Sequence, residues 1–203
     1  MMKVKFTILS ICTALLFTAS SDLNDPLQIG DKAPLTNQRV EDTSGRTLTL
    51  AEVAGRNGLL VIFTCNTCPW VARWESRYND ISALAGSNNI GVIGLNPNER
   101  IRNRGESMAD MKKRAQKQGY TFPYAIDKDH KLADAFVATR TPEIFLFDSN
   151  LRLVYHGAID DNASDASQVE EAYVMDAIRA MVAGNEITTQ ETRSLGCTIK
   201  RTE

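Results

Sequence analysis

The sequence predicts a single α/β domain in which helices cover both faces of a mixed β-sheet. Two apolar runs, 59–64 and 90–95, have the composition of buried strands, and a segment with helical spacing of its apolar residues follows each run. A hairpin and a last helix come later, and this order is typical of a mixed sheet between two helical layers. The 203 residues, 43% of them hydrophobic, are enough for one core.

The predicted elements follow one another along the chain with short connections. An N-terminal hairpin over 40–50 precedes the first apolar run, because apolar residues alternate with threonine on either side of a turn. The remaining expected elements are a helix over 69–85 ended by Gly86, a helix over 109–118, a short strand over 122–127, a short helix over 130–138, a hairpin of 143–147 with 151–159, and a last helix over 168–182 ended by Gly184.

Residues 1–21 have the layout of a secretory signal peptide. Lys3 and Lys5 precede an apolar stretch over 6–17, and small residues follow, so we expect cleavage near Ser20 or Ser21. The mature protein is then periplasmic or secreted and has no membrane span. The alternatives are an uncleaved anchor and a lipoprotein site at Cys12, which is disfavoured because Ile11 stands where a small residue is wanted.

The expected organisation is therefore a signal peptide (1–21), one domain (22–186) and a polar C-terminal tail (187–203) that carries Cys197. The formal net charge is -2, with 23 basic and 25 acidic residues. Such a balance gives no overall field that attracts nucleic acid or an anionic membrane, so neither is an expected partner.

Cys65 and Cys68 form a C-x-x-C pair between a buried strand and a predicted helix. A cysteine at the start of a helix lies near unpaired amides that stabilise a thiolate, and the thiolate is the nucleophile of disulfide exchange. The second cysteine can then resolve a mixed disulfide. Pro69 suits the first helical turn because it has no N–H there.

Cys197 has no evident mate, because removal of Cys12 leaves three cysteines. Leu195 and Ile199 bracket it with apolar side chains, which indicates a segment that docks on the domain. Three outcomes remain open for Cys197: a buried inert thiol, an exposed free thiol, or a third redox thiol that exchanges with the C-x-x-C pair.

Several motifs together resemble the thioredoxin fold, and within it the redoxin branch that includes peroxiredoxins and membrane-anchored thiol reductases of the bacterial periplasm. They are "IGDKAPL", the hairpin, "VIFTCNTC", the later "TP" at Thr141–Pro142, and the closing hairpin and helix. More narrowly, "CNTCPW" and the terminal "GCTIK" resemble an exported peroxiredoxin-like subgroup with CNxCP and GC[ST]IK motifs.

The resemblance implies that the Thr141–Pro142 bond is cis, that its loop faces the C-x-x-C pair, and that Thr141 offers backbone groups to a bound peptide. A proline that simply begins a strand is the alternative. Two family features are absent: Leu59 replaces the buried acid of thioredoxins, and Val71 replaces the glutamate of related periplasmic reductases. The group that deprotonates Cys68 is therefore not identified.

We predict a thiol–disulfide oxidoreductase that exchanges disulfides with protein partners, with Cys65 as attacking thiolate, Cys68 as resolving thiol and an unidentified redox donor. Trp70 lies off the core stripe of the helix and is a candidate for partner docking, although core packing explains it too. The pair Asn66–Thr67 is neutral and gives no direction of electron flow.

Three other classes compete with this prediction. If Cys68 is taken as the reactive cysteine of a peroxidase of this branch, the family's threonine falls at Cys65 and its proline falls at Val61. Both family residues are therefore absent. A metal site would need His130 or His156 near the cysteines, so we expect neither a metal nor a cofactor. A purely structural C-x-x-C disulfide in a binding module closes too short a loop to stabilise much.

Overall fold

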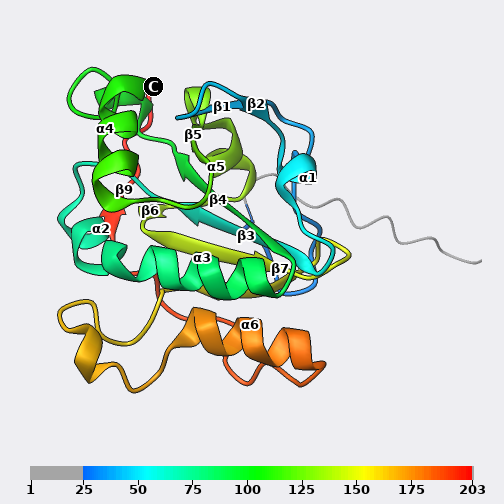
Figure 1. The fold of residues 1–203 in the computed structure, drawn as a ribbon. Coiled ribbons are helices and arrows are strands. Elements are labelled where there is room, and N and C mark those ends of the chain that lie inside the picture. The colour runs from blue at the N-terminus through cyan, green and yellow to red at the C-terminus, as the bar shows by residue number, and fades with distance from the viewer. Residues whose placement is uncertain (1–24, 203) are drawn as a thin grey trace, which may run out of the picture.

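The computed structural model describes residues 25–202, and its centre is a seven-stranded sheet (Figure 1). The order across this sheet is β2-β1-β5-β4-β3-β7-β8, and β6 and β9 form a separate two-stranded sheet. The strands are β1 (Val40–Asp42), β2 (Thr47–Leu48), β3 (Gly58–Phe63), β4 (Ile90–Asn96), β5 (Tyr124–Ile126), β6 (Arg140–Thr141), β7 (Glu143–Phe147), β8 (Leu153–Gly157) and β9 (Cys197–Thr198).

The sheet is mixed, as the sequence predicts. β3 pairs with β4 and β4 with β5 in parallel, whereas β7 is antiparallel to both β3 and β8. The predicted N-terminal hairpin is confirmed over 40–48, but the expected strand residue Leu50 begins a short helix instead, because Thr49 caps that helix. Strand β1 of the hairpin extends the sheet by an antiparallel pairing with β5. The fold class is therefore the predicted thioredoxin-like α/β arrangement with an N-terminal hairpin extension.

Helices cover both faces of the sheet. They are α1 (Leu50–Val53), α2 (Pro69–Trp74), α3 (Tyr78–Ser87), α4 (Met108–Gln118), α5 (Lys131–Ala135) and α6 (Tyr173–Ala183), with 3-10 turns η1 (Glu75–Arg77), η2 (Glu99–Ile101), η3 (Lys128–His130) and η4 (Ala166–Gln168). Leu60 and Ile62 of β3 pack with α3 and α6, and Leu59, Val61 and Phe63 pack with α1 and α5. Both faces of β3 are thus buried, as its continuous apolar run requires.

The predicted helix over 69–85 is wrong in one respect, because η1 interrupts it and separates α2 from α3. Glu75, which is 5% exposed, accepts hydrogen bonds from Arg114 of α4 and from Tyr120. Trp74 Nε1–H donates to Asp160 at 2.7 Å. These partners lie far away in the sequence, so apolar spacing alone does not reveal the interruption.

Two other predicted boundaries shift slightly. α3 continues through Gly86 to Ser87 and ends at Asn88, because a glycine with open space around it does not by itself end a helix. The last helix begins at Tyr173 rather than at residue 168, since 166–168 form a 3-10 turn capped by Asp165, and Gly184 ends α6 as predicted.

The predicted signal peptide (1–21) and the alternative lipid site at Cys12 lie outside the described residues. Between residues 25 and 202, no helix has both the length and the apolar character that a membrane crossing needs.

Candidate functional site

Cys65 and Cys68 lie in the connection between β3 and α2. The sequence predicts Cys65 at the start of the helix, and the structure corrects this, because Cys68 is the N-cap residue and Pro69 is the first residue of α2. The unpaired amides of the first turn therefore lie closer to Cys68 than the sequence indicates. Cys65 belongs to the loop that precedes the helix.

Cys65 is a free thiol that is 1% exposed. Its Sγ and the Thr141 Oγ1 form a hydrogen-bonded pair at 3.1 Å. Burial, and next the negative charge of Glu106, raise the pKa of Cys65 to about 11, although the Thr141 hydroxyl and two backbone amides act in the opposite direction. Cys65 is thus protonated at neutral pH, contrary to the expected stabilised thiolate.

Cys68 is joined to Cys197 by a disulfide, with their Cα atoms 6.1 Å apart. The C-x-x-C cysteines are therefore not bonded to each other in this state, and Cys197 is not a free thiol. Cys68 is 4% exposed, and its Sγ lies 3.2 Å from the Thr141 carbonyl oxygen. This distance is a contact rather than a hydrogen bond, because a disulfide sulfur carries no hydrogen.

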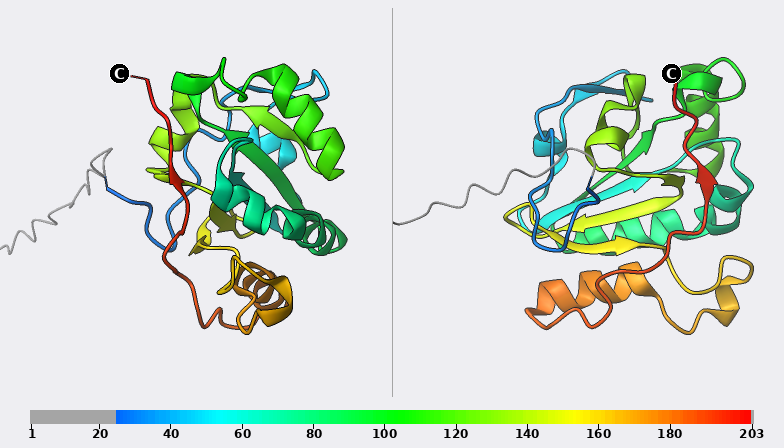
Figure 2. Two further views of the ribbon diagram at one scale, coloured as in Figure 1. Left: turned by 90° about the vertical axis from the view of Figure 1, so that its left-hand side faces the viewer. Right: turned by 180° about the vertical axis from the view of Figure 1, so that it is seen from behind.

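The C-terminal tail reaches the site as an extended segment. It leaves α6, crosses the side of the domain and forms β9, which pairs antiparallel with β6 (Figure 2). In this pairing Cys197 lies opposite Thr141, and Thr198 lies opposite Arg140. The expectation that the tail docks is confirmed, because Ile199 is 4% exposed in the apolar cluster, although Leu195 stays 39% exposed.

The loop at Thr141–Pro142 faces the cysteines, as the resemblance implies. The bond is cis, which confirms that prediction, and Thr141 contacts both Cys65 and Cys68. The backbone of Thr141, which is expected to pair with a substrate chain, is paired here with the tail strand β9.

Glu143 and His156 hold the loop before Pro142 in place. Glu143, 3% exposed, accepts hydrogen bonds from the backbone amides of Thr139 and Arg140 at 2.7 and 2.9 Å. Its other oxygen lies 2.8 Å from His156 Nε2, and the imidazole stacks on Phe145. His156 is therefore part of the framework that fixes the loop before Pro142.

Glu106 is a site residue that the sequence analysis does not identify. It is fully buried and accepts from the backbone amides of Asn66 and Thr67 at 2.8 and 3.0 Å, from the Thr67 hydroxyl, and from Asn96 Nδ2 at 2.7 Å. Three of these four donors belong to Asn66 and Thr67, so Glu106 fixes the two residues between the cysteines. Glu106 comes from the loop after β4, and no spacing in the sequence connects it with Cys65.

The two positions at which related proteins carry an acidic residue are buried and apolar in this chain. Leu59 and Val71 are both 0% exposed. The buried carboxylate near the C-x-x-C pair is instead Glu106, and it contacts backbone amides rather than a cysteine sulfur.

Trp70 is half-buried and packs against the core and against the cysteine cluster. The Arg73 guanidinium lies over its ring at 4.7 Å from the centroid, and the Trp74 ring is 6.0 Å away. Trp70 therefore borders the site, but one of its faces is already covered. A role in partner docking remains a prediction.

The described residues hold no group of three or more His, Cys, Asp or Glu side chains placed to bind a metal ion. The other candidate ligand, His130, has its ring nitrogens 2.6 Å from Asp134 and 3.1 Å from Thr202.

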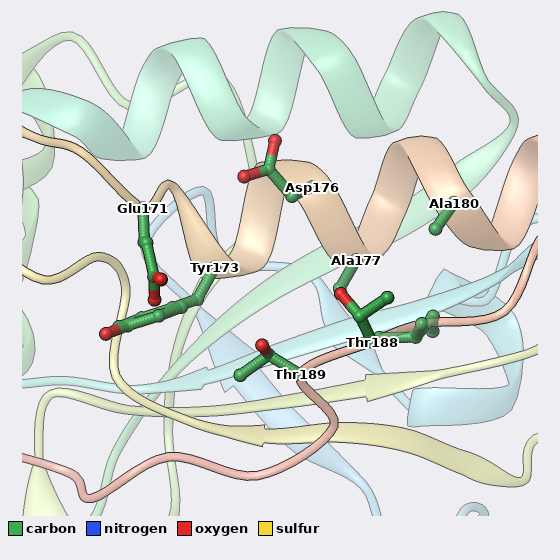
Figure 3. Close-up of a pocket in the computed structure, with 8 residues that line it drawn as sticks. Glu171, Tyr173, Asp176, Ala177, Ala180, Thr188 and Thr189 are labelled. Atoms are coloured by element: carbon green, nitrogen blue, oxygen red, sulfur yellow. The ribbon is translucent and has the colours of Figure 1, made fainter.

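A small pocket of about 220 Å³ lies away from the cysteines, between α6 and residues 187–189 (Figure 3). Glu171, Tyr173 and Asp176 provide its polar groups, and Ala177, Ala180, Ile187, Thr188 and Thr189 complete the lining. No cysteine lines this pocket.

The site therefore brings three sulfurs to one loop. The free thiol of Cys65 lies next to the Cys68–Cys197 disulfide. Cys65, Cys68 and half-buried Cys197 pack as one cluster. Such an arrangement supports thiol–disulfide exchange, in which a thiolate attacks one sulfur of a disulfide and the other sulfur leaves.

The fold and site define a thioredoxin-like redox protein, and the comparisons with known proteins place it further. The AhpC/TSA family profile matches residues 29–156, so the chain belongs to the AhpC/TSA family. The match ends before the tail that carries Cys197. A search of curated proteins finds no match.

Solved structures share the fold of this chain. A hypothetical protein from Sinorhizobium meliloti 1021 is 30% identical, with a TM-score of 0.79 over 88% of this chain and 97% of its own. An uncharacterized conserved protein from Geobacillus kaustophilus is 26% identical, with a TM-score of 0.80 over 87% and 93%. A peroxidoxin from Mycobacterium tuberculosis, 12% identical with a TM-score of 0.53 over 77% and 95%, shares the fold.

Proposed function

We propose that this protein is a thiol–disulfide oxidoreductase that exchanges disulfides with protein partners through three cysteines. The observation that carries the proposal is the meeting of one free thiol and one disulfide at the Thr141–Pro142 loop. A disulfide that only fixed the tail to the domain would not need another buried cysteine, Cys65, hydrogen-bonded to the same loop.

The geometry favours roles opposite to those expected from the sequence. Cys197 comes from an added strand, as a partner cysteine would, and it is bonded to Cys68. Cys68 is then the sulfur that faces the partner. Cys65 is more deeply buried, has a raised pKa and lies inside the loop, which suits a resolving thiol.

The proposed cycle starts with all three cysteines reduced. The Cys68 thiolate attacks a partner disulfide, and one partner sulfur leaves as a thiolate. Cys65, after losing its proton, attacks Cys68 Sγ, and the second partner sulfur leaves, so the partner is reduced and a Cys65–Cys68 disulfide forms. Cys197 then attacks Cys68 Sγ, and Cys65 leaves and takes up a proton.

The product of the last step is the state described here, with Cys68–Cys197 joined and Cys65 free. A dithiol donor returns the protein to the reduced form by two further exchanges at the same sulfurs. Each step is reversible, so the same residues oxidise partner dithiols when the donor is a disulfide.

Trapping with double variants tests the proposal. In Cys65→Ser/Cys197→Ser, partner adducts should accumulate on Cys68, because both thiols that could release them are gone. In the matched control Cys68→Ser/Cys197→Ser, few adducts should form on Cys65. Adducts mainly on Cys65 would reverse the assigned roles, and the absence of adducts in both variants would refute exchange with proteins.

A second candidate function is peroxide reduction, which the Cys68–Cys197 disulfide favours in a member of the AhpC/TSA family. The Cys68 thiolate would attack the peroxide O–O bond, leaving a sulfenic acid and releasing water or an alcohol. Cys197 would then form the disulfide and release water. Cys65→Ser should keep this activity and Cys197→Ser should lose turnover, whereas protein exchange requires Cys65.

Export is part of the proposal and is supported by the lysines and the apolar stretch within residues 1–21. A periplasmic or extracellular location would also let the Cys68–Cys197 disulfide persist. Cell fractionation and N-terminal sequencing of the mature protein should place its first residue near position 21 or 22, and a protein retained at full length in the cytosol would contradict export.

A further inference from the structure

The docked tail makes hydrogen bonds on both sides of Cys197. On the N-terminal side, Arg140 Nη1 donates to the Gly196 carbonyl at 3.1 Å. On the C-terminal side, Ile199 N–H donates to the Thr139 carbonyl at 3.0 Å. Together with the β6–β9 pairing, these bonds fix the register of the tail independently of the disulfide.

Side chains of the tail also fill defined positions. Ile199 is 4% exposed and packs into the cluster beneath the sheet. Arg201 Nε–H donates to Asp134 Oδ1 at 2.7 Å, and its Nη2 donates to the Ala138 carbonyl at 2.6 Å. The surface beside β6 therefore favours an apolar residue two positions after the cysteine and a positively charged residue four positions after it.

Gly196 lies where no side chain fits. A Cβ at this position would come within 2.7 Å of the Thr141 carbonyl carbon and closer still to its oxygen. Its φ is not in the left-handed region, so the restriction comes from contact with the loop and not from the conformation of the backbone. Because Thr141 precedes the fixed Pro142, the backbone there cannot shift readily to make room.

We propose that the tail occupies the position of a protein substrate, and that the substrate is an extended segment with glycine directly before its reactive cysteine. A branched apolar residue two positions later and a basic residue four positions later complete the recognised pattern. This inference rests on the proposed function and specifies its substrate class.

The geometry of exchange explains why the tail and a substrate compete. While Cys197 is bonded to Cys68, β9 covers the edge of β6 and both C-x-x-C sulfurs are buried. The transfer of Cys68 from Cys197 to Cys65 breaks the disulfide that holds β9 beside β6. An incoming segment then adds to β6 in the same register, and its cysteine thiolate attacks Cys68 Sγ while Cys65 leaves as a thiolate.

Synthetic peptides can test this pattern on the reduced full chain carrying Cys65→Ser and Cys197→Ser. The probe is the peptide Ser-Leu-Gly-Cys-Thr-Ile-Lys-Arg with its cysteine activated as a thiopyridyl disulfide, so that attack by Cys68 releases thiopyridone. We expect the peptide with alanine in place of glycine to react at least 10-fold more slowly, and peptides with Asp for Ile or Glu for Arg to react more slowly as well.

Equal rates for the glycine and alanine peptides would overturn the inference, even if protein adducts form on Cys68. Conversely, discrimination between the peptides would support it even if partner trapping fails, because the readout does not depend on any cellular partner. Formation of Cys68–Cys197 disulfides between two chains, seen as a dimer in the absence of reductant, would assign the position to a second copy and would also overturn it.

A measurement within the chain removes any dependence on peptides. Gly196→Ala should lower the fraction of molecules with the Cys68–Cys197 disulfide, measured by mass spectrometry in a glutathione buffer. Gly86→Ala is the matched control, because a Cβ there meets no atom within 4 Å. An unchanged disulfide fraction in Gly196→Ala would show that the contact with Thr141 does not select glycine.

Discussion

Cys65 illustrates how the surroundings of one residue determine its reactivity. The docked tail and the Thr141–Pro142 loop remove the Cys65 sulfur from water, and a buried thiolate is disfavoured where no cation compensates it. Glu106 adds a negative charge nearby. A thiol in such surroundings is protonated at neutral pH.

We therefore predict a pH dependence for the alkylation of Cys65. With the Cys68–Cys197 disulfide intact, the rate should keep rising up to about pH 11, because the pKa is raised from 9.0 to about 11. At pH 8 this means about 100-fold less thiolate than at a pKa of 9. Reduction and release of the tail should move the profile to lower pH, as mass spectrometry of the Cys65 peptide can show. A midpoint near 9 in the oxidised protein would contradict this.

Glu106 gives a second prediction at this scale. Each carboxylate oxygen of Glu106 accepts two hydrogen bonds, and Glu106→Gln replaces one of these oxygens with an NH2 donor, which leaves two buried donors unpaired. We expect the free energy of unfolding to fall by about 2 to 4 kcal/mol in urea titrations. The alkylation profile of Cys65 should also move to lower pH, because a negative charge is lost. Glu170→Gln, at an exposed position, is the control and should change neither quantity.

At the scale of elements, the interruption between α2 and α3 depends on a buried ion pair. Arg114 of α4 reaches Glu75 with both Nε and Nη2, and Glu75 is almost fully buried. The Glu75–Arg114 ion pair joins η1, which directly follows α2, to α4. The N-terminal end of α4 follows the loop that carries Glu106. The position of the C-x-x-C loop is thus supported from both ends.

Arg114→Leu should accordingly destabilise the protein strongly. It leaves the carboxylate of Glu75 buried without a cation, which typically costs about 3 kcal/mol or more. Equilibrium unfolding in urea measures the change. Lys113→Leu, one position away on an exposed part of the same helix, is the matched control and should stay within about 0.5 kcal/mol of the wild type. Equal effects of the two substitutions would refute the structural role of the pair.

At the scale of the whole molecule, the Cys68–Cys197 disulfide closes a loop across most of the domain. Its two cysteines are 129 positions apart in the sequence. The disulfide thereby restricts the unfolded chain far more than a C-x-x-C disulfide would. The proposed exchange at Cys68 would consequently be linked to the stability of the whole fold.

Cys197→Ser should lower the free energy of unfolding by about 4 to 5 kcal/mol in the absence of reductant, from the loop-closure entropy of this separation. Wild-type protein unfolded in reductant should lose a similar amount, because it lacks the same constraint. Urea titrations with and without dithiothreitol provide the comparison. A Cys197→Ser protein as stable as the oxidised wild type would show that the disulfide does not form in solution.

Local patterns were sufficient to predict much of the fold. The apolar run of 59–64, the alternation in the first hairpin and the glycine after α6 each depend on neighbours in the sequence, so strand type, hairpin position and helix end followed from them. The cysteine spacing and the Thr141–Pro142 pair likewise located the site, because resemblance to a fold family fixes which segments meet.

The state of the cysteines was decided only by the tertiary structure. Which sulfur bonds to Cys68 depends on where β9 adds to β6, and the raised pKa of Cys65 depends on burial by segments 76 and more residues away. Glu106 reaches the site because β4 ends at the same edge as β3. Sequence patterns record periodicity and spacing, whereas pairing, burial and charge proximity arise from contacts between distant segments. The sequence therefore determined where the candidate site lies, and the tertiary structure determined how its cysteines are paired and buried.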